Sequence, residues 1–380
     1  MLRCNIFTPQ PRFAFLLLTA MIVLGRAPAL AQTFNTKALL EDYSREIFET
    51  NAAGFMGPLV IVANVGANDA LYNSAYVPAT NGFYVRLSVR TMFATVLESE
   101  RTYTAHLPLE QKNNPHPVGS AEWWRITQLN LFKLSLSQAA QDGALETDVE
   151  TATVFGGEGS GFVVPKEWMR ENISYIDSAT LAGLPSELTL TNGTNQKMVF
   201  AAVPQITVGS LWHSELDLRF VPPVVFDPNV GKFSFYGVGL THAFTNWFRD
   251  PPFDAAVQVA FQRSQIKNEV GVTKAQLEAR TNLFTVNLHA SKRWGWAEPY
   301  VGVSYETLNS DASYTFTLPQ SIKDEIGYDI DPQTVPVSLS DQAIKATLGF
   351  TAHLGPVMAF VSAGFAKHMI YSGGIGYRFE

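Results

Sequence analysis

The sequence predicts an all-β protein: a transmembrane antiparallel up-and-down β-barrel with a short N-terminal amphipathic helix. Three observations predict this class: segments that alternate apolar and polar residues, links that alternate in length, and aromatic residues beside the short links. Charged residues make up 16% of the 380 residues, against about 25% in typical soluble domains. The formal net charge of -7 argues against the cationic face that a nucleic-acid-binding protein needs.

The first 31 residues have the three parts of a Sec-type signal peptide. Two arginines precede an apolar run, Phe13 to Leu24, and a small-residue site ends at Ala31. A membrane anchor is the alternative, but a spanning helix needs about 20 apolar residues. We expect cleavage between Ala31 and Gln32 and a location in the bacterial outer membrane.

Residues 32–81 are predicted to form an N-terminal periplasmic or plug segment. Over residues 36–50, apolar side chains fall on one helical stripe and acidic side chains on the other, a pattern typical of an amphipathic helix. Such a helix either caps the periplasmic mouth of the barrel or lies in its lumen as a plug.

The barrel itself is predicted over residues 82–380. One strand falls within 82–97, and nine more fall between 199 and 379, each with period-2 alternation or a strand-like composition. The sequence therefore predicts about ten strands. The region 99–198 alternates poorly, so it is either an irregular insertion or a source of extra hairpins that would raise the count to 12 or 14.

The links between these strands alternate in length. Short turns are predicted at 209–210, 249–252, 294–296 and 354–356, and longer links at 222–231, 265–279 and 310–340. Outer-membrane barrels have short periplasmic turns and long extracellular loops. Aromatic rings suit the headgroup level of a membrane. We therefore predict a periplasmic aromatic girdle beside the short turns: Trp212, Trp247, Trp294, Trp296, Tyr300, Tyr377 and Phe379.

Polar residues on the opposite strand faces are predicted to line the lumen. The candidates are Arg86, Arg90, His213, Glu215, Asp217, Arg219, His289, Glu306, Lys345 and His353. These groups would either select a passing solute by their field and spacing or pair with one another and fill the barrel. A barrel of this strand number is too narrow to be a wide general porin.

No catalytic or metal-binding motif is visible in the sequence. The glycine-rich run 156–161 lacks the Lys and Ser/Thr of a phosphate loop. The histidines are scattered, and the single cysteine, Cys4, lies in the predicted leader. We expect no metal, no cofactor and no enzymatic activity. An outer-membrane hydrolase is the least favoured hypothesis, because no nucleophile, base and orienting group can be assembled.

Three motifs resemble those of a known protein family. They are Val203–Gly209, Glu215–Pro222 and Gly237–His242, within a similarity that runs from about Leu39 to the C-terminus. The family is an uncharacterised group of bacterial outer-membrane β-barrel proteins, a domain of unknown function. It is loosely similar to FadL-type long-chain fatty-acid transporters, which implies an N-terminal segment in a barrel. No functional residue can be carried over.

The leading hypothesis is passage of a small solute across the outer membrane, and a hydrophobic solute is one candidate. The alternative is a structural or surface-interaction barrel that binds an external partner through long extracellular loops. We expect a monomer whose partners are outer-membrane lipid, the barrel assembly machinery and an unidentified solute. The aromatic Phe379 next to the last position resembles the assembly signal of outer-membrane barrels.

Overall fold

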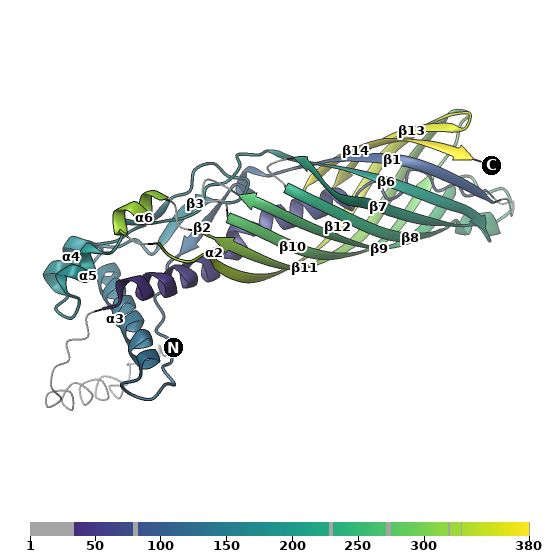
Figure 1. Ribbon diagram of the computed structural model, residues 1–380. Coiled ribbons are helices and arrows are strands. Elements are labelled where there is room, and N and C mark those ends of the chain that lie inside the picture. Colours follow the sequence, from purple (N-terminus) through teal and green to yellow (C-terminus); the bar gives the residue numbers. More distant parts are fainter. Residues whose placement is uncertain are drawn as a thin grey trace, which may run out of the picture. The chain divides into compact units, whose positions relative to one another are not determined.

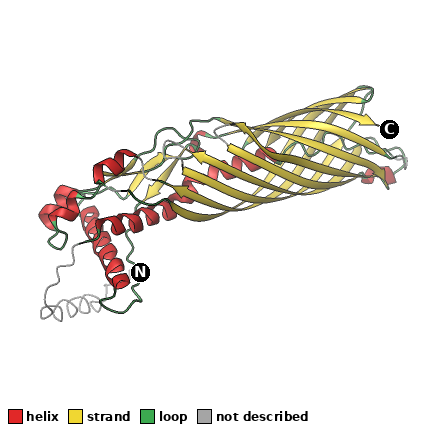
Figure 2. Ribbon diagram, viewed as in Figure 1, coloured by secondary structure: helices red, strands yellow, loops and turns green. Residues whose placement is uncertain are grey.

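The computed structural model describes residues 34–78, 83–227, 231–270, 275–317, 320–327 and 329–379. The predicted leader and its cleavage site lie outside these residues. Within them, ten strands form a closed antiparallel barrel, which confirms the predicted fold class and strand number (Figures 1 and 2). The barrel and the described helices belong to one compact unit, Asn35–Glu380.

Each barrel strand pairs with its neighbours in the chain, except at the point of closure. The strands are β1 (Tyr84–Thr95), β6 (Met198–Leu211), β7 (Ser214–Asp227), β8 (Gly231–His242), β9 (Asp254–Val270), β10 (Ala275–Ser291), β11 (Ala297–Phe316), β12 (Gln333–Leu354), β13 (Val357–Phe365) and β14 (Met369–Phe379). Strand β1 pairs with both β14 and β6, which closes the barrel. Closure removes the sheet edges where all ten strands pair, whereas β12 before Ala346 is paired with β11 alone.

The two ends of the barrel differ. We call one the turn end, because tight links join β6 to β7, β10 to β11 and β12 to β13 there, and the β8–β9 link holds only η3 (Phe244–Trp247). The opposite end carries residues 96–197, the long insertion between β1 and β6. We call that insertion the cap, and that end the cap end.

Two of the predicted long links are wrong, because most of their residues are strand. Strand β7 continues to Asp227 and β9 to Val270, while β10 begins at Ala275. The outward residues of these extensions, such as Lys267 and Gln276, are polar and exposed. The alternation therefore reverses in these segments, because apolar residues such as Ile266 and Leu277 are buried on the inward face, while the backbone pairing continues. The predicted link 310–340 shrinks for the same reason to 317–332, which includes α6 (Gln320–Ile326).

The cap supplies no barrel strand within the described residues. Its elements are η2 (Glu98–Glu100), the paired strands β2 (Thr102–His106) and β3 (Asp148–Ala152), the paired strands β4 (Gly161–Val163) and β5 (Glu187–Thr189), and the helices α3 (Ala121–Gln141), α4 (Lys166–Asn172) and α5 (Ser178–Ala182). Helix α6 is joined to the cap, because Ser186 donates its backbone N–H to Glu325 at 2.7 Å and its hydroxyl to the same oxygen. These bonds hold the pKa of Glu325 below its ordinary value.

Helix α2 (Thr36–Ala67) is twice as long as the helix predicted from the sequence. Beyond residue 50 its apolar side chains occupy every face, and Phe55, Met56 and Leu59 are buried. A helix that is apolar all round is a buried one, and α2 packs against β12, β6 and β1. Gly54 allows close packing on β2, since a Cβ there would lie 2.4 Å from the Tyr103 ring.

No described helix is both long enough and apolar enough to cross a membrane.

Candidate functional site

The N-terminal segment runs through the barrel from the cap end to the turn end. Near the cap end the ring of Phe48 stacks on Phe316, with 3.4 Å between centroids. At the turn end the carbonyl of Val77 accepts a bond from Asn246 at 2.7 Å, and the carbonyl of Pro78 accepts one from Ser210. We call residues 36–78 the plug. The plug therefore begins at the cap end and finishes at the turn end, where β1 begins and where β14 ends at Phe379.

Two buried arginines of the wall hold the bend of the plug that follows α2. Arg219 donates to the carbonyl of Asp69 at 3.1 Å and to that of Ala70. Arg90 also donates to the Ala70 carbonyl and, at 3.0 Å, to the amide oxygen of Asn73. Ala70 has a φ of 50°, a conformation that is rare for alanine. The two guanidinium groups stabilise this bend by bonding its main chain.

An acidic residue of the plug completes a buried ion cluster. Lys345 of β12 lies 2.8 Å from Asp69 and 2.7 Å from Glu306. Ser372 of β14 donates to the second oxygen of Asp69 at 2.8 Å. Buried ions need such partners, because a lone buried charge is costly. Asp69 therefore links the plug to two strands of the wall.

Two further acids are bonded within the wall itself. Asp217 accepts bonds from Gln205 at 2.7 Å, Thr207 at 2.6 Å and Gln258 at 2.8 Å. Glu215 forms an ion pair with Arg86 at 3.0 Å and also accepts a bond from the Tyr84 hydroxyl. The predicted row on β7 therefore lies inside the barrel and is engaged in bonds rather than bathed in a water-filled channel.

The two predicted histidines of the wall have different surroundings. His289 is buried and stacks on Tyr72 of the plug, with ring centroids 4.1 Å apart and planes 9° from parallel. His353 lies near the turn end, where its Nε2 is 2.5 Å from the Glu298 carboxylate. Nine of the ten lumen candidates thus face the interior of the barrel: Arg86, Arg90, Glu215, Asp217, Arg219, His289, Glu306, Lys345 and His353.

Two predicted placements are wrong. His213 lies in the β6–β7 turn, with a φ of 60°, and its ring contacts Trp247 at 5.6 Å. The turn interrupts the alternation before that residue. Tyr300 belongs to the inward set of β11, so it is buried beside Tyr72 instead of joining the girdle. The other predicted girdle residues are exposed near the turn end: Trp212, Trp247, Trp294, Trp296, Tyr377 and Phe379.

A family model matches almost the whole chain, from residue 11 to residue 379. It is that of a family of unknown function, DUF6588. The chain belongs to DUF6588. The motifs that suggested a family resemblance lie on β6, β7 and β8 of its barrel. No curated protein matches this DUF6588 chain, and its resemblance to FadL-type transporters stays a prediction.

Several solved structures resemble the DUF6588 chain weakly. The translocator domain of the autotransporter NalP from Neisseria meningitidis is 8% identical, with 88% of this chain and 99% of that chain covered and a TM-score of 0.27. The outer-membrane OmpT of Vibrio cholerae is 11% identical over 80% and 99% of the two chains, with a TM-score of 0.20. Pseudomonas aeruginosa OpdK with vanillate is 7% identical over 78% and 98%, with a TM-score of 0.11. Such scores are too low to support an inference.

Sequence reasoning missed the part of the site that lies on the plug. Asn68 donates to Thr285 at 2.9 Å, and Ser74 donates to Glu298 at 2.5 Å. The signal was present in the sequence, because two polar pairs, Asn68-Asp69 and Asn73-Ser74, follow an apolar stretch. Among the described residues, no group of His, Asp and Glu is placed to hold a metal ion. The expectation that this DUF6588 chain is not an enzyme stays a prediction.

Proposed function

We propose that this DUF6588 protein is an outer-membrane barrel that its own plug keeps closed and that anchors the cap at the cell surface. The observation that carries the proposal is the occupied lumen, in which residues 67–78 bond to strands on all sides of the wall. Three further features support it: the belt on the outer face of the barrel, the pairing of the lumenal charges, and the difference between the two ends.

The outer face of the barrel carries an apolar belt. It begins at the aromatic residues of the turn end and stops at a second aromatic ring, made of Phe220, Tyr236, Phe261, Phe284 and Tyr305, all exposed. Beyond that level most outward residues are polar, among them Lys232, Arg263, Lys267, Arg280 and Asp311. From Phe253 to Phe261 the chain rises about 27 Å, or about 20 Å along the barrel axis at a strand tilt of about 40°. This height approaches the lipid-facing band of transmembrane barrels.

The interior of the barrel supports closure. An open pore exposes its lining to water, whereas Arg90, Arg219, Asp217 and Lys345 are all buried. Their charges are bonded to the plug or to neighbouring strands. Opening a path would break several charge-assisted bonds, which are about twice as strong as neutral ones. We therefore favour a barrel that is closed at rest over the freely conducting pore that the sequence also allowed.

The two ends of the barrel support its orientation. Short turns belong to the periplasmic side of outer-membrane barrels and large loops to the outside. By this rule the cap and the start of α2 lie outside the cell, and the C-terminal end of β14 lies in the periplasm. The cap, together with α6, is then the surface that meets an external partner. This is the surface-interaction alternative raised by the sequence.

Cysteine labelling of intact cells tests this orientation. The described chain contains no native cysteine, so single cysteines can be introduced at exposed Val118 in the cap and at exposed Arg249 at the turn end. A membrane-impermeant maleimide should label Val118→Cys in intact cells and Arg249→Cys only after the outer membrane is opened. The reverse pattern, or labelling of both in a soluble periplasmic fraction, would refute the proposal.

Solute passage is a second candidate function, favoured by how the plug is bonded. The stretch from Asn68 to Ser74 is held largely by hydrogen bonds and ion pairs, which water can replace. Displacing this stretch alone, with α2 left in place, would expose Leu71 and Tyr72 but not the buried apolar residues of the helix. Passage of a solute would then require a trigger that releases Asp69 from Lys345. Uptake that depends on such a trigger would distinguish this function from permanent closure.

A further inference from the structure

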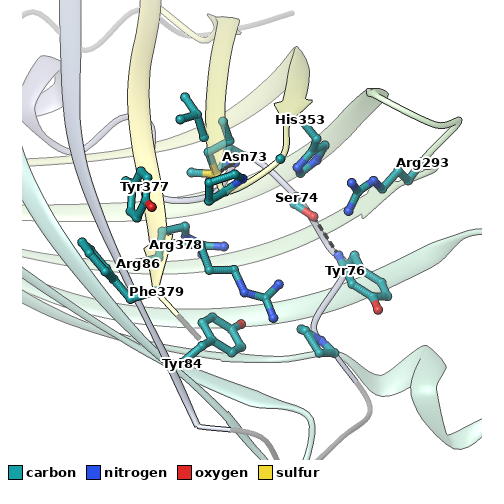
Figure 3. A pocket seen from close by; sticks show the side chains of 15 residues that line it. Asn73, Ser74, Tyr76, Tyr84, Arg86, Arg293, His353, Tyr377, Arg378 and Phe379 are labelled. Carbon is teal, nitrogen blue, oxygen red and sulfur yellow. Dashed lines mark hydrogen bonds between the residues drawn. The ribbon is translucent and has the colours of Figure 1, made fainter.

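At the turn end, the lumen beside the plug opens into a pocket of about 640 Å³. Plug residues from Asn73 to Pro78 form one side of it, and residues of β1, β12, β13 and β14 form the other. Figure 3 shows its side chains, with Arg86 and Arg378 extending from one side and Arg293 and His353 lying on the other. The volume falls in the range of small-molecule sites.

The lining of this pocket is rich in arginine. It contains the arginines Arg86, Arg293 and Arg378 and no Asp or Glu among its described residues. Arg86 and Arg378 stand directly opposite each other in the β1–β14 register. Like charges in such positions destabilise a sheet. Glu215, behind the lining, bonds to Arg86, while Arg378 lies over the ring of Tyr84 at 4.2 Å.

A second observation points to a ligand in the same place. The Nε of Arg86 is buried and, among the described residues, has no hydrogen-bond acceptor. An unsatisfied buried donor costs stability, and an oxygen atom of a ligand would satisfy it. On the other side of the pocket, Arg293 is exposed and bonds to the carbonyl of Gly295 through its Nε. Its remaining N–H groups can therefore reach a ligand without breaking a buried network.

We propose that this pocket binds a small soluble anion that carries carboxylate or phosphate groups. The planar fork of arginine matches both of these groups and can bond to them through two parallel hydrogen bonds. Arginines on two sides favour an anion with two acidic ends. The tyrosine rings of Tyr76 and Tyr84, which also line the pocket, can pack against the body of such a molecule.

Calorimetry with the full-length protein in a neutral detergent tests this site. Succinate is the probe, and succinamide, which has the same shape without charge, is its control. We expect succinate to bind at least about tenfold more tightly than succinamide, since a charge-assisted bond is worth about 1.4 kcal/mol or more. Equal binding of the two, or no binding of succinate, would refute the proposal.

Two variants show whether any binding occurs in this pocket. Arg293→Gln should weaken succinate binding about tenfold, the effect of one lost charge-assisted bond. Arg280→Gln is the matched control, because Arg280 is an exposed arginine of β10 near the cap end. This variant should bind succinate as tightly as the unmodified protein does. The proposal is wrong if the two variants bind succinate equally well. Arg293 is preferred to Arg86 because replacing Arg86 would also leave Glu215 without its ion pair.

A lipid headgroup could supply the same phosphate chemistry, and nanodiscs separate the two sources. A site for a soluble anion should bind succinate with the same affinity in phospholipid nanodiscs as in detergent. Loss of succinate binding in nanodiscs would show that lipid phosphate occupies the pocket, and it would overturn the assignment to a soluble ligand.

Discussion

At the scale of single residues, Arg219 joins the wall and the plug most directly. Only 3% of its surface is exposed, and it donates to Gln205 at 2.8 Å as well as to the main chain of Asp69 and Ala70. The carbonyl acceptors belong to a bend that only the folded plug supplies. The charge of Arg219 is therefore satisfied in full only when the plug is in place.

Arg219→Ala should lower the free energy of unfolding by about 2 to 4 kcal/mol, because it leaves buried carbonyls and Gln205 without donors. The measurement is a thermal or denaturant melt in detergent. Arg263→Ala is the control, since Arg263 is exposed on the outer face above the belt, and surface changes stay within about 0.5 kcal/mol. Equal melts for the two variants would show that the bonds of Arg219 to the plug do not form.

Alternation along the strands predicted the inward residues well, because successive side chains of a strand must point to opposite faces. Asp217 and Arg219 could be placed from this rule alone. It could not place His213, where a turn begins, or Tyr300, whose aromatic ring suits a girdle and a core equally. It also could not show that Asp69 is the partner of Lys345, since that pairing depends on a segment far away in the sequence.

At the scale of elements, the long barrel strands have an outer face that is divided into an apolar part and a polar part. Strand β10 shows the division clearly: Leu288 and Phe284 are exposed and apolar, and Asn282 and Arg280 follow on the same outer face. The sequence predicted the part of such strands near the turn end, whereas the part near the cap end was interpreted as loop. The apolar residues change from the outer to the inner face toward the cap end, where Ile266 and Leu277 are buried inside the barrel, so the pattern of a lipid-facing strand stops while the backbone pairing continues.

Leu288→Arg should destabilise the folded barrel by about 2 to 4 kcal/mol, the cost of a cation near the middle of the bilayer. Asn282→Arg, on the same strand and face but above the aromatic ring, should cost at most about 1 kcal/mol. The comparison is made by folding titrations in lipid vesicles. If the two changes cost the same, the belt does not mark the membrane.

Only the first half of helix α2 could be predicted from the sequence. Its first half has an amphipathic pattern and was predicted, whereas its second half is apolar on all sides and has no period to detect. Only the surrounding barrel explains why Met56, Leu59 and Val60 are buried. The environment that stabilises the helix is built from strands that come later in the chain.

At the scale of the whole molecule, the barrel and the plug form one closed structure. Removing the plug would leave Arg90 and Arg219 without most of their partners and Lys345 with Glu306 alone. The wall and the plug therefore depend on each other energetically. The sequence left open whether the lumenal charges conduct a solute or pair with one another, and the contacts of Asp69 and Ala70 favour pairing.

Ion conductance across planar bilayers tests this closure most directly. The full-length protein should insert without producing a steady current, whereas Asp69→Ala combined with Arg219→Ala should produce intermittent openings, because the plug has lost its two main attachments. A stable, ohmic current from the unmodified protein would contradict the account, since it would show a continuous water-filled path where the structure places the plug.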